Sequence, residues 1–135
     1  DRGLARMYLY NLTLEKPSAL HGAVSGSFTG IESGVGEIAV IRGSSFIDII
    51  RIDGKTGKLK ALSSTDMFSI IRHLAVFRPP SFDQDLLVVS SDSGNMTVFK
   101  VNQDGSLGTV FNHPFGKAGC LRTVPGEHLC TDPFG

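Results

Sequence analysis

Short apolar stretches alternate with turn-forming residues along most of the chain. The stretches are rich in Val, Ile and Phe, which are favoured in strands, and Gly, Asp, Asn and Ser separate them. Asp, Asn and Gly tolerate the left-handed backbone that tight hairpin turns require. The pattern therefore predicts an all-β chain. We expect strands near residues 20–28, 37–41, 46–52, 58–63, 71–77, 85–90, 96–101 and 107–111.

The second half of this pattern repeats the first half at an offset of 48 or 49 residues. Four antiparallel strands repeated every roughly 40–50 residues are typical of a β-propeller. We therefore interpret the two units, about 19–63 and 70–111, as two WD40-like blades. The alignment rests on Phe28 with Phe77, Glu37–Val40 with Asp85–Val88, and Ile47–Ile52 with Met96–Val101.

One segment also fits a helix. Met67, Ile70, Ile71 and Leu74 follow a helical spacing, and the preceding Ser-Thr-Asp could cap a helix there. The same segment aligns with residues 19–28, which contain two glycines and a valine that disfavour a helix. We therefore expect strand in both units.

Two blades cannot close a propeller ring, and closure is what removes the open edges of a sheet. The chain also begins at Asp1 rather than Met and stops at Gly135 within a strand-turn unit. We expect a fragment of a longer chain, in which residues 127–135 begin the inner strand of a third blade. We also expect the two blades not to fold alone.

The composition excludes several classes of function. Thirteen Lys and Arg balance thirteen Asp and Glu, so the net charge is zero, whereas direct nucleic-acid binding usually needs a basic excess. No apolar run approaches the roughly 20 residues that cross a bilayer, so we expect no membrane partner. Two cysteines provide no disulfide framework and favour a reducing compartment.

Two motifs superficially resemble ligand sites. Residues 54–58 read Gly-Lys-Thr-Gly-Lys, but Ile49 stands where a phosphate loop needs glycine, so we expect a hairpin turn. His113, Cys120, His128 and Cys130 lie close in sequence, but only the last pair has the spacing of zinc ligands. We therefore expect no metal and no cofactor.

No catalytic constellation emerges from the sequence. The chain contains no Gly-x-Ser-x-Gly motif for a nucleophile. Glu37 and Asp85 occupy equivalent repeat positions, so we interpret them as residues that begin a strand rather than as a catalytic pair. His21 and His73 are isolated histidines in strand-like runs with no partner implied. A propeller enzyme or small-molecule binder would need titratable residues gathered on its inner strands, and none are expected here.

The segment from Phe115 to Gly126, FGKAGCLRTVPG, is a distinctive loop. It combines three glycines, a proline, a cysteine and two cations in twelve residues. Glycine permits unusual backbone angles and close approach, and Arg and aromatic residues are enriched at binding hot spots. The segment therefore indicates either a protein contact or a sharply turning connection between blades.

Several motifs together resemble the N-terminal part of the splicing factor 3b subunit 3 family. They are MYLYNLTL at 7–14, GSFTG at 26–30, EIAVIRG at 37–43, IIRHLAVFR at 70–78, VVSSDSG at 88–94 and FGKAGCLRTVPG at 115–126. The resemblance covers residues 7–135 and leaves 1–6 as an N-terminal extension. A wider group of three-propeller proteins includes damaged-DNA-binding protein 1, which 16–29 and 77–87 also resemble, and the largest cleavage and polyadenylation specificity factor subunit.

This resemblance implies an incomplete seven-bladed propeller in a nuclear scaffold rather than an enzyme. Family members support branch-site recognition within the U2 small nuclear ribonucleoprotein. Their partners are the helical-repeat subunit and small subunits of splicing factor 3b, so pre-mRNA and small nuclear RNA are contacted only indirectly. No small-molecule substrate is implied. The wider group leaves two alternatives, a cullin ubiquitin ligase adaptor and a polyadenylation factor subunit.

The resemblance also implies a protein contact at the connecting loop 113–127. Leu121 stands where a second basic residue is expected, so one charge contact is missing. The residues that match the motif of this interface loop are Phe115, Gly116, Lys117, Gly119, Cys120, Arg122, Pro125 and Gly126.

Overall fold

The computed structural model describes residues 12, 14–30, 36–115, 126–132 and 134. Within these residues the chain forms eight strands, which confirms the prediction of an all-β fold. The strands are β1 (Leu20–Gly26), β2 (Glu37–Arg42), β3 (Phe46–Ile52), β4 (Leu59–Asp66), β5 (Ile71–Phe77), β6 (Leu86–Ser91), β7 (Asn95–Val101) and β8 (Leu107–Pro114). No helix in the described residues has the length and apolar character needed to span a bilayer.

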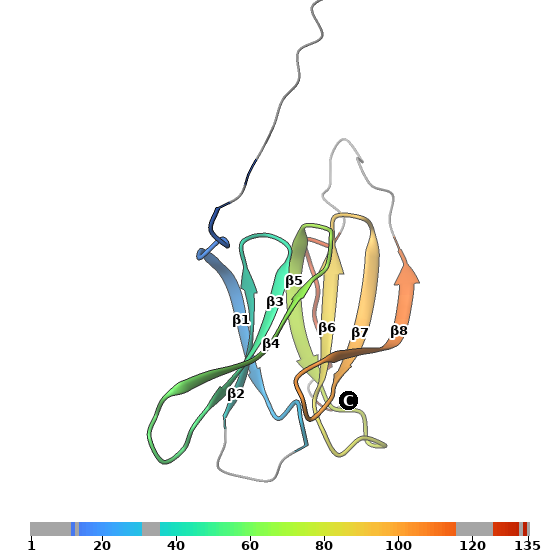
Figure 1. Cartoon of the computed structure of the whole chain (residues 1–135). Coiled ribbons are helices and arrows are strands. Elements are labelled where there is room, and N and C mark those ends of the chain that lie inside the picture. Colours follow the sequence, from blue (N-terminus) through green and yellow to red (C-terminus); the bar gives the residue numbers. More distant parts are fainter. Residues whose placement is uncertain (1–11, 13, 31–35, 116–125, 133, 135) are drawn as a thin grey trace, which may run out of the picture.

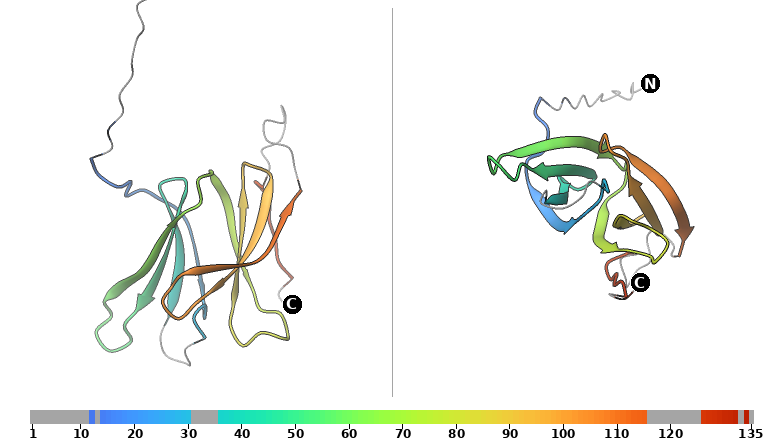
Figure 2. Two further views of the ribbon diagram at one scale, coloured as in Figure 1. Left: turned by 45° about the vertical axis from the view of Figure 1, so that its right-hand side comes forward. Right: turned by 90° about the horizontal axis from the view of Figure 1, so that it is seen from below.

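The strands form two separate four-stranded antiparallel sheets (Figure 1). Each sheet is a simple meander, in the order β1-β2-β3-β4 and β5-β6-β7-β8. β1 contacts β5 across the two sheets. Figure 2 shows these two strands on one side of the molecule and β4 and β8 on the other. The inner strands of neighbouring units therefore lie together, as in adjacent propeller blades.

The strand registers repeat between the sheets, including their irregularities. β1 and β5 are each irregular near their first residues, and the third and fourth strands of each sheet are irregular near their centre. Leu20 pairs with Arg42 at the irregular start of β1, and Ile71 pairs with Ser91 at the irregular start of β5. The inner strands are therefore offset by 51 residues, whereas the second strands are offset by 49.

This register corrects one anchor of the sequence alignment. Phe77 lies within β5, but Phe28 follows the end of β1 and is fully buried between the sheets. The two phenylalanines are not equivalent, because the connection from β1 to β2 is longer than the connection from β5 to β6. A constant offset cannot align positions on both sides of connections of unequal length.

The helical alternative around residues 67–74 is wrong. β4 continues through Asp66 and β5 begins at Ile71, so only four residues link the sheets. The amide of Met67 donates to the carbonyl of Ser45, and that of Ile71 donates to the carbonyl of Ser44. These bonds attach the link to the β2–β3 turn rather than to a helical turn.

The main core lies between the two sheets. Each sheet contributes alternate residues of its strands to this core, which is the pattern of a half-covered sheet. The buried residues are Phe28, Ala39, Ile41, Ile47 and Ile49, which face Ile71, Leu74, Leu87, Val89, Phe99 and Val101.

A second, smaller core lies on the far face of the second sheet. Leu86, Val88 and Val98 form it, and Leu129 packs against them. β6 is therefore buried along its whole length, as expected for a strand covered on both faces. The hydroxyl of Thr131 donates to the carbonyl of Val76 at 3.1 Å, so Thr131 lies beside β5, and residues 126–132 form no strand.

Candidate protein-interaction surface

The connections between strands are divided between the two ends of the sheets. One end, which we call the link end, carries the β2–β3 turn, the 67–70 link, the β6–β7 turn and the end of β8 (upper end in Figure 1). The opposite end carries the β1–β2, β3–β4, β5–β6 and β7–β8 connections. The interface loop predicted from the sequence follows β8 and therefore leaves the second sheet at the link end.

Two of the eight predicted interface residues lie within the described part of the chain. Phe115 is about half exposed, and its amide donates to the carbonyl of Gly94 at 2.8 Å. This bond attaches the start of the loop to the β6–β7 turn. The remaining six lie outside the described residues: Gly116, Lys117, Gly119, Cys120, Arg122 and Pro125.

Gly126 is buried against this chain's own β6. Its φ of 77° is in the left-handed region, and a Cβ there would lie 2.9 Å from the Cβ of Ser90. The Ser90 hydroxyl donates to the Gly126 carbonyl at 2.7 Å. Glycine at this position therefore lets the returning chain pack closely on the second sheet.

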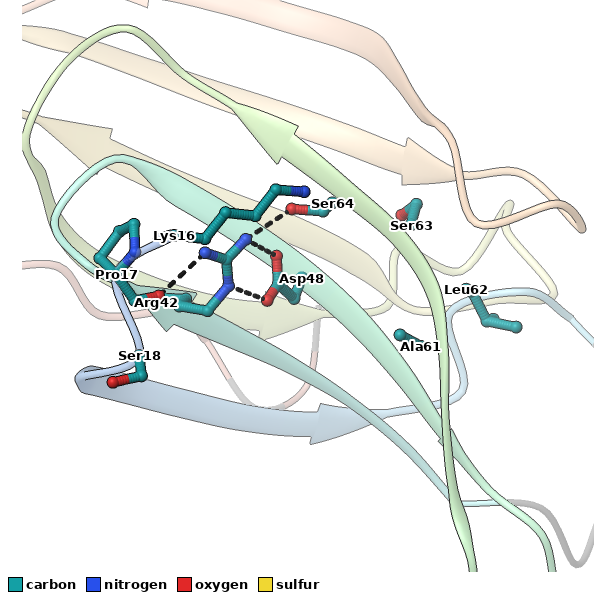
Figure 3. Close-up of a pocket in the computed structure, with 9 residues that line it drawn as sticks. All are labelled: Lys16, Pro17, Ser18, Arg42, Asp48, Ala61, Leu62, Ser63 and Ser64. Atoms are coloured by element: carbon teal, nitrogen blue, oxygen red, sulfur yellow. Dashed lines mark hydrogen bonds and ion pairs between the residues drawn. The ribbon is translucent and has the colours of Figure 1, made fainter. Parts of the chain in front are cut away.

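A bidentate ion pair lies on the open face of the first sheet (Figure 3). Arg42 Nε lies 2.5 Å from Asp48 Oδ2, and Arg42 Nη2 also donates to the Ser64 hydroxyl at 2.8 Å. Arg42 Nη1 donates to the carbonyl of Pro17, and the guanidinium lies 4.7 Å from the centre of the Phe46 ring. These contacts border an open hollow of about 530 Å³.

The electrostatics of this pair are those of a structural contact. Burial raises the pKa of Asp48, but hydrogen bonds from Arg42 and Ser64 and the charges of Arg42 and Lys16 lower the pKa further than burial raises it. The carboxylate is therefore held charged and is a weaker base than a free aspartate, and Arg42 already occupies both of its oxygens. The hollow contains no activated nucleophile among the residues that line it.

Glu37 forms a second network, at the opposite end of the first sheet. One carboxylate oxygen accepts the amides of Phe28 and Thr29, and the other accepts the Thr29 hydroxyl and Arg51. Asp85, which the sequence repeat aligned with Glu37 and which lies one residue before β6, accepts the amide of Ser27 and pairs with Arg78. Both acids therefore fix the connection that leaves β1, which agrees with their interpretation as structural residues.

His21 and His73 lie closer together than the sequence suggested. With Arg72 they line one cavity of about 240 Å³ between the inner strands β1 and β5. The interpretation of isolated histidines, and of inner strands without gathered titratable groups, is therefore wrong. In the matched registers His21 is equivalent to Arg72, because each is the residue skipped at the irregular start of its inner strand. A repeat aligned at 48 or 49 residues gave no signal for this arrangement.

The motifs that resembled ligand sites have other roles where the structure describes them. The turn at 54–58 is a hairpin, in which the carboxylate of Asp53 accepts the Lys55 amide and the Thr56 hydroxyl. His113 stacks on Phe111. Across the described ranges no three His, Cys, Asp or Glu side chains are placed to hold a metal ion, and Cys120 lies outside them.

Comparison with known families decides which propeller these sheets belong to. The family model "RSE1/DDB1/CPSF1 first beta-propeller" matches residues 19–135. The chain belongs to this first-propeller family. The two sheets are therefore two blades of that propeller.

Relatives of this first propeller carry names from splicing. The chain is 41% identical over 130 residues to "Splicing factor 3B subunit 3" of Drosophila melanogaster, and 38% identical to "Probable splicing factor 3B subunit 3" of Dictyostelium discoideum. It is 40% identical to "Pre-mRNA-splicing factor RSE1" of Mycosarcoma maydis. Each match covers 96% of this chain and 10% of the relative, so the chain spans about a tenth of their length.

Membership of the first-propeller family also explains the hollow beside Arg42. In a closed propeller, neighbouring blades cover both faces of each sheet and only the blade ends stay open. In a closed ring, the open face of the first sheet would pack against a further blade. Contacts with other molecules are expected at the ends of the blades, where the links and turns lie.

Proposed function

We propose that this chain is the N-terminal part of a non-catalytic scaffold subunit of the splicing factor 3b complex. The complex would act in the nucleus, within the U2 small nuclear ribonucleoprotein, and support branch-site recognition during pre-mRNA splicing. The observation that carries this proposal is 41% identity, over 96% of the chain, to a protein named splicing factor 3B subunit 3.

The chemistry of the described residues supports binding rather than catalysis. Its buried carboxylates fix loops, and Arg42 and Asp48 satisfy each other. Two packed sheets provide a rigid support whose ends present turns and links. Such an arrangement is suited to holding protein partners in a set geometry.

The proposed partners are other proteins of the complex, namely the helical-repeat subunit and small subunits. A net charge of zero supports protein contacts over direct contacts with RNA, because phosphate binding depends on an excess of cations. Pre-mRNA and small nuclear RNA would be held by the assembly and contacted only indirectly by this chain.

We further propose that the interface loop, residues 113–127, contacts these partners. Lys117 and Arg122 would bind carboxylates or carbonyls on the partner, and Phe115 would add an apolar contact. The half-exposed Phe115 at the link end supports this assignment. Gly126 would contribute indirectly, since its contact with Ser90 fixes the end of the loop.

A second candidate function is that of the other proteins covered by the same family model, which are a ubiquitin ligase adaptor and a polyadenylation factor subunit. The matching family model also covers DDB1 and CPSF1. A cullin ubiquitin ligase adaptor or a cleavage and polyadenylation subunit would use the same first propeller. The splicing names of the relatives at 38–41% identity favour the scaffold of splicing factor 3b.

The test is affinity purification of the full-length parent from nuclear extract, with partners identified by mass spectrometry. We expect recovery of the helical-repeat splicing subunit together with the branch-site small nuclear RNA. Recovery of a cullin would favour the ligase adaptor, and recovery of polyadenylation factors would favour the third lineage. Either result would contradict the splicing proposal while leaving the fold unchanged.

The interface loop has its own test. Arg122→Glu in the full-length parent should lower recovery of the protein partners by about tenfold, because one charge contact becomes repulsive. Lys58→Glu is the matched control, since Lys58 is exposed on a hairpin at the opposite end. Equal recovery of the protein partners with both variants would show that the interface loop does not contact them.

A further inference from the structure

The 67–70 link displays an aromatic side chain at the link end. Phe68 is 91% exposed. Its φ is 52°, and among the described non-glycine residues Phe68 is the one whose φ is positive. Left-handed backbone is uncommon for a bulky residue, and such strain clusters at functional sites. A glycine would adopt this conformation without strain.

The chain around Phe68 is held in place from both blades. Met67 and Ile71 are hydrogen-bonded to the β2–β3 turn of the first blade. The amide of Ile70 donates to the carboxylate of Asp92, and the amide of Asp92 donates back to the carbonyl of Ile70. The link is thus attached to turns of both sheets.

A local bond completes this arrangement. The amide of Phe68 donates to Asp66 Oδ1 at 2.9 Å, which fixes the backbone at the strained residue itself. The phenyl ring is therefore presented on a fixed backbone, although it gains almost no burial within the described chain. A preorganised aromatic group loses little conformational freedom on binding, so more of its contact energy becomes affinity.

Phe68 has apolar neighbours on the same end of the molecule. Ile70 is 41% exposed and Phe115 is 49% exposed. Both are attached to the β6–β7 turn, Ile70 through Asp92 and Phe115 through the carbonyl of Gly94. The link and the start of the interface loop are therefore both hydrogen-bonded to the β6–β7 turn.

The position of the link indicates what can cover it. Blades pack through the faces of their sheets, as the core between these two sheets shows. The link lies at the end of the sheets, so further blades of a closed ring leave it open. Asp66 and Asp92 flank it with partly exposed carboxylates, which favour cations on the surface that binds there.

We propose that Phe68 is a preformed anchor that inserts into an apolar pocket of a separate protein, with Lys or Arg at the rim of that pocket. The exposed ring on its fixed, left-handed backbone carries this inference. It rests on the proposed function, because it extends the protein contact from the interface loop across the β6–β7 turn to the link.

The experiment is site-specific photo-crosslinking in the full-length parent. Phe68 is replaced by p-benzoylphenylalanine, the parent is assembled in nuclear extract and irradiated, and crosslinked peptides are identified by mass spectrometry. We expect a peptide from a separate protein, with apolar residues and a neighbouring Lys or Arg. Crosslinks to RNA, to a second copy or to another part of the parent chain would overturn the proposal.

Two further positions make the result specific. Leu59 is 66% exposed at the opposite end of β4, and the same replacement there measures background crosslinking. A crosslinking yield at position 68 that is no higher than the yield at position 59 would also overturn the anchor. Replacement of Phe115 tests the interface loop. Crosslinks to a splicing protein from position 115 alone would refute the anchor at Phe68 and support the proposed function. A non-splicing protein captured at position 68 would support the anchor and contradict the proposed function.

A substitution separates binding from folding. Phe68→Gly relieves the backbone strain and removes the ring, so the melting temperature of the full-length parent should stay the same or rise. Recovery of the partner captured by crosslinking should fall at least tenfold, while Leu59→Gly should leave it unchanged. A lower melting temperature would show that the ring serves the fold, and unchanged recovery of the partner would show that the ring is not an anchor.

Discussion

At the scale of single residues, Glu37 shows how one buried carboxylate organises a connection. The side chain is 3% exposed and accepts two amides, one hydroxyl and one guanidinium. The amides belong to Phe28 and Thr29, which follow β1 and close the core between the blades. Burying a charge is costly unless it is paired and hydrogen-bonded, and Glu37 meets both conditions.

Removing this charge should loosen the β1–β2 connection. Glu37→Gln leaves Arg51 without its partner and places an amide group among donors, so we expect a loss of about 3 kcal/mol in local stability. Hydrogen exchange of the Phe28 and Thr29 amides in the full-length parent measures this loss. Asp85→Asn is the matched control, with an expected loss of roughly 1 kcal/mol, because its partner Arg78 is half exposed. Equal losses would contradict this account.

The same carboxylate predicts a pH dependence. Burial raises the pKa of Glu37, but hydrogen bonds from Thr29, Arg51 and Phe28 lower it further, so the folded value lies below the ordinary 4.5. A lowered folded pKa means that the stabilisation is complete above the ordinary value and is lost as the pH falls through the folded value. The difference in melting temperature between wild type and Glu37→Gln should therefore be constant down to about the ordinary pKa and shrink below it. A difference in melting temperature that grows as the pH falls below the ordinary pKa would contradict a lowered folded pKa.

At the scale of elements, the β7–β8 turn of the second blade is hydrogen-bonded to β4, the outer strand of the first blade. The β7–β8 turn contains Gly105, whose carbonyl accepts the Ser63 hydroxyl of β4. Gln84 makes a second connection, since its side-chain amide donates to the carbonyls of Phe28 and Val101. Hydrogen bonds of this kind set the angle between blades, which apolar packing alone leaves less specific.

The close contact at Gly105 gives a sharp test. Its φ is 88°, and an added Cβ would lie 2.6 Å from the Cβ of Leu62. Gly105→Ala should therefore destabilise the full-length parent by about 3 kcal/mol through strain and collision. Gly57→Ala is the control, because Gly57 has a φ of 67° with no atom within 4 Å of the added Cβ. Its expected cost is roughly 1 kcal/mol. Chemical unfolding measures both, and equal costs would exclude the collision.

At the scale of the whole molecule, the two blades leave much of their surface open. One face of the first sheet carries the half-buried Ile38 and Ile50 beside the Arg42 pair, and half of the residues of its outer strand β4 are exposed. β8 likewise carries exposed Val110 and Phe111. The facing sides of the two sheets bury the larger core, and the far face of the second sheet buries a smaller one. Two neighbouring blades thus complete one of the interfaces that a closed ring would supply.

We therefore expect residues 1–135 expressed alone to aggregate or remain insoluble. The open faces and unpaired strand edges would recruit other chains. Size-exclusion chromatography and thermal unfolding test this expectation. A monomer with a sharp, cooperative unfolding transition would prove it wrong.

Much of the fold could be predicted because it depends on local patterns. The strand positions followed from runs such as Ile47–Ile52 and from the Asp-Gly turns beside them, since strand period and turn chemistry are properties of short segments. The true offset of the inner strands could not be predicted. It depends on the unequal lengths of the connections between the first and second strands, and the longer of these connections buries Phe28 between the blades.

The candidate surface was only partly accessible from the sequence. The composition of the interface loop marked it as unusual, and six of its eight matching residues lie outside the described part of the chain. Phe68 was missed, because an aromatic residue near apolar neighbours is normally interpreted as core. Its exposure became visible only in the folded chain, where the four-residue link is bonded to turns of both sheets.

By itself the sequence determined the strand content, the repeat and the family, because these depend on residue type and order along the chain. The tertiary structure alone decided which distant residues meet. It brought His21, Arg72 and His73 to one cavity, and it exposed Phe68 beside the β6–β7 turn. The physical reason is that strand pairing and the packing of sheets set distances between segments, and neither is encoded in any single segment.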